Sequence, residues 1–497
     1  MKRLLTFCHA VIFCCMAFSQ NQNINWVFGD SAGLNFSGVE PTFFKTSIGT
    51  YEACSSISDE SGQLLFYTNG ETVWNRNHEI MSNGDSLSIG GIGGGIHSSI
   101  TQGTIIIKKP NSTSLYYLIL MFYIHTPLGV DSSGLCYSTI DMDLNAGLGG
   151  LVEKNIPFFQ CSYREKMQAV RHANGRDWWL VTQINVLGDT IIPFIKFLIT
   201  PEGIGTPIQQ VIGPGSLIPG YGSVGQMKFS QNGSKLAITR GNYFDIYDFN
   251  RCSGELSNCI TVQASEPEFA LLYGCEFSPD GRKLYFTDLF SINQSKIYQY
   301  CINCPEPIIE TKKILYVETL SDIVIGQLQL GPDNKIYFPM AVALLPNQVY
   351  NFQNQNISVI QNPNGDSSTC NLDTLIISLN DARNTGALPN LPNYNLGALE
   401  GSACDTLTSV ISQPVLRELQ VFPNPASNYL TISVTDETLL LANLNAITIT
   451  TLSGGVVKTI RQPKTLTLYT GDLTAGFYLV TLTFQSGEAQ NFKIIIQ

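Results

Sequence analysis

A turn rich in aspartate, asparagine and glycine, followed by a strand of alternating aromatic and aliphatic residues, recurs six times along this 497-residue chain. The copies are SDESGQLLFYTNG (58–70), KPNSTSLYYLILM (109–121), RHANGRDWWLVTQ (171–183), FSQNGSKLAITRG (229–241), FSPDGRKLYFTDL (277–289) and LGPDNKIYFPM (330–340). Asp-Gly and Asn-Gly supply the left-handed backbone that a tight hairpin needs, and the residues after them alternate with the period of a strand. The copies are roughly 50 to 60 residues apart, and self-similarity at such a period is typical of a β-propeller.

Two further strand-like segments lie near the ends of this region. They are NWVFGDSAGLNF (25–36) and LDTLIISLN (372–380), and we expect them to come together as a seventh blade. Pairing of the first and last strands closes a ring and removes open sheet edges, which promote aggregation. The sequence therefore predicts an all-β fold with a β-propeller of about seven blades, and six or eight blades remain as alternatives.

The N-terminus and the composition indicate an exported protein. Lys2 and Arg3 precede an apolar stretch from Leu4 to Phe18, and this pattern predicts a signal peptide over residues 1–20. No later apolar run reaches the ~18 residues of a membrane-spanning helix, so we predict a soluble protein without a transmembrane segment. The formal net charge is −11 and no cluster of Lys and Arg is present, which argues against binding to nucleic acid.

The repeat pattern stops after residue 380. The next stretch is rich in Pro, Asn, Gly and Ser, and short alternating strands begin again near Leu416. Seven short strands in about 80 residues are typical of a small Ig-like β-sandwich. We predict a propeller over residues 21–397, a linker over 398–417 and the sandwich over 418–497.

The C-terminal segment carries an ordered set of motifs, VFPNP (421–425), LTAGFYLV (473–480) and KIIIQ (493–497). In these motifs it resembles the C-terminal sorting domain of type IX secretion system substrates, an export route of the Bacteroidota. The motif residues that the resemblance marks are Pro423, Asn424, Pro425, Gly476, Tyr478 and Lys493. The resemblance implies a secreted or cell-surface protein that passes through the periplasm. It also implies that the type IX export and surface-attachment machinery are partners, and that cleavage falls before Leu419.

The rest of the chain resembles a second family. The copy at 277–288 is similar to the inner-strand hairpin of WD-repeat-like blades, and residues 25–397 resemble the propeller ectodomains that often precede such sorting tags. This resemblance implies no activity. Loops at one mouth of a propeller vary without disturbing the blades, so we predict a non-catalytic binding module for polysaccharide or for another surface protein. The alternatives are a glycan-active hydrolase or lyase with carboxylates in the funnel, and a structural component of an adhesion or gliding surface.

One short segment mixes carboxylate, aromatic and imidazole side chains. It contains Glu71, Trp74, Arg76 and His78, with His97 nearby in sequence. Aromatic faces bind sugars and paired carboxylates hydrolyse them, so these five residues are the candidate ligand-binding group. Blade packing accounts for such side chains more simply, and no catalytic residue is predicted.

The sequence predicts no metal site and no cofactor. Asp141-x-Asp143-x-Asn145 begins like a calcium-binding loop, but it has no glycine at the sixth position and no glutamate at the twelfth. We interpret it as a turn between strands, and Ca²⁺ remains a weak alternative.

Ten cysteines follow the signal peptide, an even number that permits disulfides in an oxidising compartment. Cys252 and Cys259 flank the hairpin-like loop SGELSN, and we predict that they pair. Cys301-x-x-Cys304 is either a tight disulfide or two cysteines with separate partners.

Overall fold

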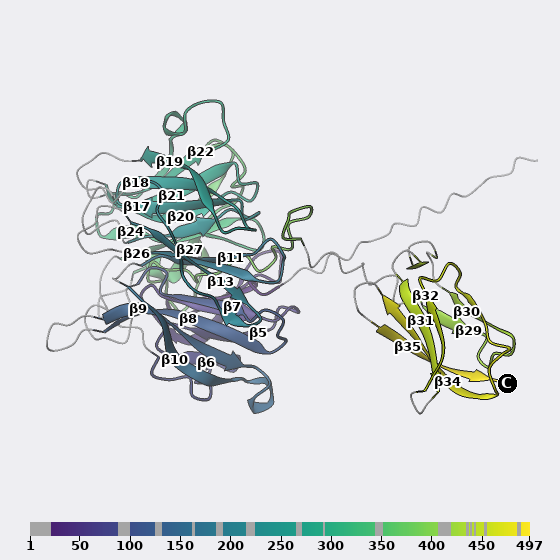
Figure 1. Cartoon of the computed structure of the whole chain (residues 1–497). Coiled ribbons are helices and arrows are strands. Elements are labelled where there is room, and N and C mark those ends of the chain that lie inside the picture. The colour runs from purple at the N-terminus through teal and green to yellow at the C-terminus, as the bar shows by residue number, and fades with distance from the viewer. Residues whose placement is uncertain are drawn as a thin grey trace, which may run out of the picture. The chain divides into compact units, whose positions relative to one another are not determined.

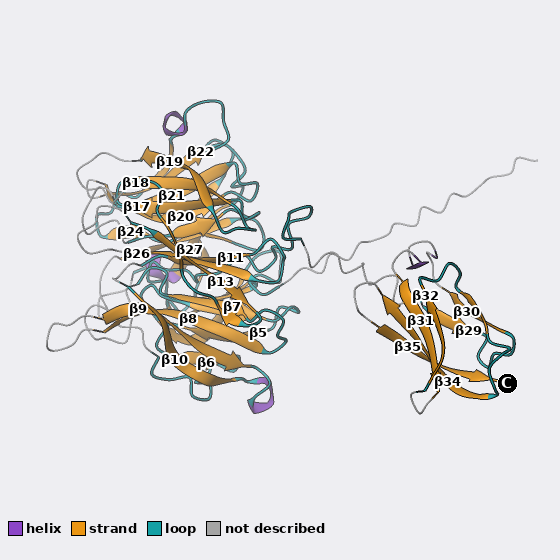
Figure 2. Cartoon of the chain, viewed as in Figure 1, coloured by secondary structure: helices purple, strands orange, loops and turns teal. Residues whose placement is uncertain are grey.

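The computed structural model describes residues 21–87, 100–124, 132–161, 165–184, 192–214, 224–264, 271–291, 294–342, 351–405, 419–433, 437, 440–441, 444–451, 455–484 and 489–497. The chain divides into two compact units, Met1–Ser402 and Ala403–Gln497 (Figure 1). Nearly all of the regular structure is strand (Figure 2). No helix in the described part is long and apolar enough to cross a membrane. The predicted signal peptide lies outside the described residues, as does most of the predicted linker.

The described residues of the first unit contain seven antiparallel sheets, which follow one another along the chain as blades. The first four blades are β1 (Asn25–Phe28), β2 (Asp30–Asn35) and β3 (Thr42–Gly49); β4 (Ser55–Ser58), β5 (Leu64–Thr68) and β6 (Val73–Asn75); β7 (Thr104–Lys108), β8 (Leu115–Ile124), β9 (Ser132–Asp141) and β10 (Gly150–Gln160); and β11 (Met167–Arg171), β12 (Trp178–Gln183), β13 (Phe194–Thr200), β14 (Gly203–Ile204) and β15 (Ile208–Gln210).

The last three blades are β16 (Met227–Phe229), β17 (Lys235–Arg240), β18 (Tyr243–Phe249) and β19 (Leu256–Gln263); β20 (Leu272–Phe277), β21 (Lys283–Ser291), β22 (Gln294–Cys301) and β23 (Lys313–Val317); and β24 (Ile323–Ile325), β25 (Gln329–Leu330), β26 (Ile336–Val342), β27 (Asn356–Ile360) and β28 (Leu372–Ser378). The described residues also contain three short 3-10 helices, Asn145–Gly147, Ile308–Thr311 and Gln353–Gln355. The prediction of an all-β propeller with about seven blades is confirmed.

The recurring turn is the hairpin between the first strands of a blade. In the sixth blade, Asp280 Oδ1 accepts hydrogen bonds from Ser278 Oγ at 2.6 Å and from the Arg282 backbone N at 3.0 Å. Gly281 has φ 68°, a left-handed conformation that costs glycine little. The carboxylate and the glycine together reverse the chain, so β21 folds back onto β20.

The first and seventh blades meet and close the ring. The ring of Trp26 in β1 packs edge-on against Tyr337 in β26, with 5.5 Å between centroids. Asp30 and Arg383 exchange two backbone hydrogen bonds, each of 2.9 Å. Both contacts join the start of the propeller to its end.

The expected composition of the seventh blade was wrong. Residues 25–36 and 372–380 belong to different sheets, because Gly29 with φ 62° turns the chain so that β1 pairs with β2. The N-terminal strands thus complete a first blade of their own with β3. The segment 372–380 supplies β28 at the outer edge of the seventh blade, beside β27.

After β28 the chain returns through the middle of the ring. Asn390 Oδ1 accepts hydrogen bonds from Gln102 Nε2 at 3.1 Å and from Gln168 Nε2 at 3.0 Å. Its Nδ2 donates to the carbonyl oxygens of Thr104 and Met167, both at 3.0 Å. One buried side chain is therefore bonded to the innermost strands of two blades, β7 and β11.

Neighbouring residues extend these contacts round the ring. The backbone N of Leu388 donates to Gln327 Oε1 of the seventh blade at 2.9 Å, and Asn393 Nδ2 donates to the Gln231 carbonyl of the fifth blade at 2.8 Å. Tyr394 packs edge-on against Trp178 of the fourth blade, with 5.5 Å between ring centroids. We call residues 384–399 the axial segment. It fills the centre that a bare ring of blades would leave open.

The second unit is a small two-sheet sandwich. One sheet contains β29 (Gln420–Phe422), β30 (Tyr429–Ser433) and β33 (Thr467–Tyr469), and the other contains β31 (Leu444–Thr451), β32 (Val456–Arg461), β34 (Gly476–Phe484) and β35 (Ala489–Ile496). Alternate residues of β34 are buried, as the period-two pattern predicts. Their side chains pack with those of β30 and β31 in one apolar core.

Candidate functional site

The Pro-Asn-Pro motif holds the last strand of the second unit. Asn424 Nδ2 donates to the Lys493 carbonyl at 2.9 Å, and the backbone N of Ile495 donates to Asn424 Oδ1 at 2.8 Å. A side-chain amide carries one acceptor and donors in the same geometry as a peptide group, so Asn424 replaces a strand residue beside β35. Pro423 and Pro425 flank it and have no backbone N–H to pair.

The other motif residues lie on the strands next to this contact. Gly476 and Tyr478 pair with Ile496 and Ile494 in the β34–β35 ladder. The side chain of Tyr478 is buried, and its hydroxyl donates to the Thr474 carbonyl at 2.8 Å. Lys493 contributes its carbonyl to the Asn424 contact while its side chain is exposed. The separated motifs thus converge on β35.

The candidate ligand-binding group separates into two parts in the second blade. Trp74 stacks on Tyr67 at 5.4 Å between centroids, and His78 Nδ1 lies 3.1 Å from the Tyr67 hydroxyl. Burial lowers the pKa of His78 and raises the pKa of Glu71. Arg76 points elsewhere and donates to the Gly147 carbonyl.

These contacts are those of blade packing, and nothing in the described residues gathers Glu71 and Arg76 with the two rings. His97 lies outside the described residues. A ligand-binding role for the group stays a prediction.

A polar pocket of about 150 Å³ opens at the end of the ring that carries the recurring turns. Residues of those turns, Ser230, Gln231 and Gly331, form part of its wall, and Leu391 and Asn393 of the axial segment form another part. The pocket is therefore shared by several blades and by the segment that fills the ring.

A buried ion pair lies in the wall of this pocket. Lys228 Nζ is 3.3 Å from Glu276 Oε2, and each side chain is 4% exposed. Lys228 also donates to Gln329 Oε1. The two oxygens of Glu276 accept hydrogen bonds from the backbone N of Phe277 and of Leu330, both at 3.0 Å. The pair is fixed in place, and its charges cancel.

Comparison with protein families identifies the second unit. Residues 420–497 match the model of the secretion system C-terminal sorting domain. The second unit is a type IX sorting domain. It directs the chain to the cell surface through the type IX machinery, in agreement with the motifs that meet at β35. Comparison with curated proteins finds no match to the chain.

Solved structures with similar folds include β-propellers. A candidate 6-phosphogluconolactonase from Bacteroides uniformis is 12% identical over 74% of this chain and 98% of its own, with a TM-score of 0.43. The Dos1 propeller is 7% identical over 65% of this chain and 69% of its own, with a TM-score of 0.33. Kluyveromyces lactis Hsv2 is 10% identical over 68% and 90%, with a TM-score of 0.34. Similarity this low carries no argument about activity.

The pocket residues were missed from the sequence although a signal for them exists. Lys228, Glu276 and Gln329 occupy the same place in three repeats. Each stands directly before the first residue of its copy, as the first letter of KFSQ, EFSP and QLGP. Each is a buried polar residue in a short strand whose other residues are mostly buried. Repeated polar side chains at one position of the innermost strands all face the ring axis. This repeated polar position was the sequence signal that could have indicated the pocket.

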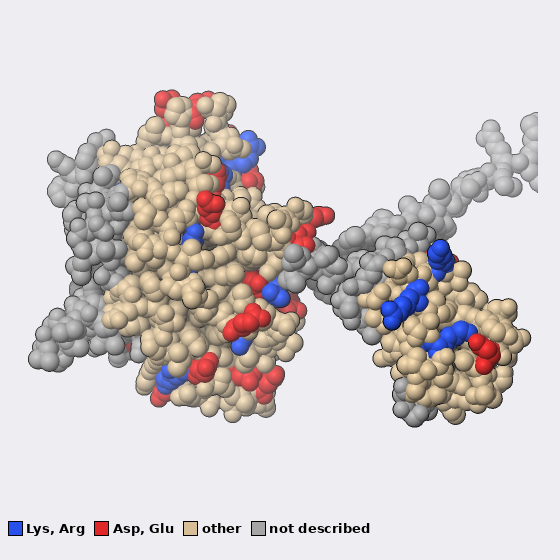
Figure 3. All heavy atoms as spheres, in the orientation of Figure 1, with Lys and Arg blue, Asp and Glu red and all other residues tan. Residues whose placement is uncertain are grey.

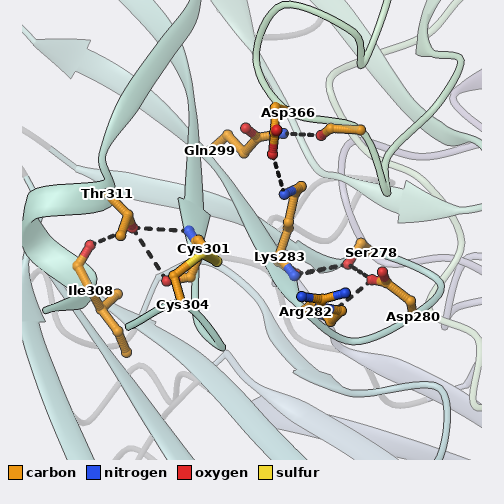
Figure 4. Close-up of a disulfide and its surroundings, with 11 residues drawn as sticks. Ser278, Asp280, Arg282, Lys283, Gln299, Cys301, Cys304, Ile308, Thr311 and Asp366 are labelled. Carbon is orange, nitrogen blue, oxygen red and sulfur yellow. Dashed lines mark hydrogen bonds and ion pairs between the residues drawn. A yellow bond between two sulfur atoms is a disulfide. The ribbon is translucent and has the colours of Figure 1, made fainter. Parts of the chain in front are cut away.

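The structure decides between the two alternatives left open for Cys301 and Cys304, and it contradicts the predicted pairing of Cys252 with Cys259. Cys301 and Cys304 form a disulfide next to Thr311, whose hydroxyl accepts from the Cys301 backbone N at 2.9 Å (Figure 4). Cys259 is a free thiol, whereas Cys252 is disulfide-bonded, so these two do not pair with each other.

The strand register explains the error. The hairpin closes at the pair Phe249 and Leu256, and Cys259 lies three residues further along β19. At about 3.4 Å per strand residue, that carries Cys259 roughly 10 Å away from the turn that contains Cys252. The Cα atoms of a disulfide are at most about 7 Å apart.

Proposed function

We propose that the propeller is a non-catalytic binding module, which the sorting domain delivers to the cell surface, and that it binds a polysaccharide or another surface protein. The observation that carries the proposal is the pocket at the turn end of the ring. It is lined by several blades, its charged groups are fixed, and the axial segment closes the ring behind it. A concave polar site with rigid walls suits recognition of a ligand.

The chemistry of the pocket favours binding over glycan hydrolysis. Among the described residues that line it, Glu276 is the one carboxylate. Hydrolysis by the usual mechanism needs two carboxyl groups, one of which exchanges a proton. Glu276 faces Lys228, and its two oxygens accept hydrogen bonds from two backbone N–H groups, so both oxygens are already occupied within the fold.

The distribution of charged side chains on the surface favours a ligand that is recognised by features other than its net charge. On the face of the first unit drawn in Figure 3, most of the Lys and Arg side chains lie close to Asp or Glu in small groups. Uncharged surface separates these groups. Such a surface gives little long-range attraction to a polyanion or a polycation.

The test is a screen of the full chain against a panel of polysaccharides and cell-surface proteins, with analysis of products in every sample. A ligand that binds the native state alone raises the melting temperature, by about 2.7 kcal/mol of stability at a hundredfold excess over its dissociation constant. We expect at least one ligand to bind and to be recovered intact. New reducing ends or unsaturated sugars would move the protein into the alternative class of glycan-active enzymes.

A further inference from the structure

The pocket at the turn end of the ring is blind. Gln168 lines it and donates through Nε2 to Asn390 Oδ1 at 3.0 Å, and Leu391 and Pro392 line it beside Gln168. Asn390 is bonded to the third and fourth blades through both ends of its amide. A polymer therefore cannot pass along the ring axis, and a chain can enter the pocket with one of its ends only.

The charges in the pocket are already balanced. Lys228 and Glu276 are the charged side chains among the described residues of its wall, and their ion pair of 3.3 Å leaves no net charge. A charged ligand would lose its hydration on entering and would find no opposite charge in return. The electrostatics of the pocket select a neutral ligand.

The wall of the pocket contains both hydrogen-bonding and apolar groups. Asn23 Nδ2 donates to the Pro392 carbonyl at 3.0 Å, while its Oδ1 is buried and has no hydrogen-bond partner in the described part of the chain. Asn395 presents an exposed amide at the rim, and Phe229 and Ile24 supply apolar surface. A sugar ring offers hydroxyl groups around its edge and C–H groups on its faces, so it can use both kinds of group.

The size of the pocket limits how much of a ligand it can hold. A volume of about 150 Å³ is well below the roughly 300 Å³ at which pockets for drug-sized ligands begin. A water molecule needs roughly 10–15 Å³ of such space, so the pocket has room for several ordered waters, which a sugar ring with its hydroxyls can displace.

From these four properties we infer that the pocket binds the terminal sugar of a neutral glycan. This inference rests on the proposed binding function and specifies its ligand. Recognition is of a chain end, so lengthening the glycan adds little to the affinity. The internal sugars of the chain stay outside the ring.

The first experiment measures binding of the full chain to single sugars and to chains by calorimetry. The probes are neutral hexoses, deoxyhexoses, N-acetylhexosamines, the matching uronic acids, linear oligosaccharides, and cyclic oligosaccharides of the same linkage, which have no ends. We expect a neutral monosaccharide to bind within about tenfold of its linear oligomers, and the cyclic compound to bind at least tenfold more weakly. Equal binding of the cyclic compound, or preference for a uronic acid or a peptide, would overturn the inference.

Variants then locate the site. Asn395→Ala removes a rim amide whose side chain is exposed, and we expect it to weaken sugar binding at least tenfold without changing the melting temperature. Asn77→Ala removes an equally exposed amide on the second blade and serves as the matched control, with unchanged affinity. Glu276→Gln leaves Lys228 uncompensated and should shift preference toward the uronic acid, a change that a purely structural role would not produce.

Failure of this inference is distinguishable from failure of the proposed function. A glycan or protein that binds the full chain with affinity unaffected by Asn395→Ala would place the ligand elsewhere and overturn the pocket assignment, while the binding function would stand. If no glycan and no surface protein binds the full chain, both the pocket inference and the proposed binding function are overturned.

Discussion

Replacing Asn390 by alanine should destabilise the propeller strongly. Its side chain joins the innermost strands of the third and fourth blades through four hydrogen bonds of 3.0 to 3.1 Å. Gln102 Nε2 and the Thr104 carbonyl keep other partners, the Met227 carbonyl at 3.0 Å and the Ser55 hydroxyl at 3.0 Å. Two groups, Gln168 Nε2 and the Met167 carbonyl, lose the partner that Asn390 provides.

The size of the effect follows from these two groups. A buried donor or acceptor without a partner costs about 1–3 kcal/mol, so Asn390→Ala should lower the free energy of unfolding by about 2–6 kcal/mol. Unfolding entropy is about 2.1 cal/mol/K per residue, or about 0.8 kcal/mol/K for a unit of roughly 380 residues. The melting temperature of the propeller should therefore fall by about 3–8 °C.

Differential scanning calorimetry of the full chain measures this shift, with the transition of the sorting domain as an internal reference. Asn395→Ala, an exposed position in the same segment, is the matched control and should move the transition by less than about 1 °C. Asn390→Asp should destabilise at least as much as alanine at neutral pH, because it places a carboxylate against two carbonyl oxygens. A loss below about 1 °C for both Asn390 variants would refute the structural role of the axial segment.

Three further outcomes are expected. Asn424→Ala removes two hydrogen bonds to β35, so it should cost the sorting domain about 1–3 kcal/mol and speed amide exchange at Ile495. Unchanged exchange at Ile495 would count against a stabilising role for the Asn424 contacts. The disulfide of Cys301 joins residues three apart, so Cys301→Ser should cost about 2 kcal/mol in thermal unfolding, and a much larger loss would point to another role. Burial lowers the pKa of His78 from 6.5, so the unfolded chain binds the proton more readily and stability is lost as the pH falls below 6.5. His78→Gln should reduce the difference in melting temperature between about pH 7.5 and about pH 5, and an unaltered difference would contradict this assignment.

The blades were predictable because their signal is local. In each repeat the turn residues and the alternating strand lie within about a dozen residues, and Asp280 and Gly281 perform the turn through contacts to their immediate neighbours. The sorting domain was predictable for a similar reason, since its motifs have a fixed order. The contact between Asn424 and Lys493 that joins them had to be seen in the structure.

The axial segment and the pocket were not predictable, because they depend on contacts between distant residues. Asn390 is bonded to residues 223 and 286 positions away, and its own surroundings in sequence show no periodicity. The ion pair of Lys228 and Glu276 joins two blades. The sequence around either residue does not show that the two are in contact, apart from their shared place in the repeat. The predicted pairing of Cys252 with Cys259 was wrong for a related reason. The spacing of two cysteines in the sequence does not give the register of the strands that carry them.

The most direct test of the account is the location of the chain that lacks residues 419–497, read by protease accessibility on intact cells beside the full chain. We assign delivery to the sorting domain and ligand binding to the propeller, which are separate units of the chain. We therefore expect the shortened chain to stay in the periplasm and to keep the melting transition of the propeller. Normal display of the shortened chain at the cell surface would contradict the account.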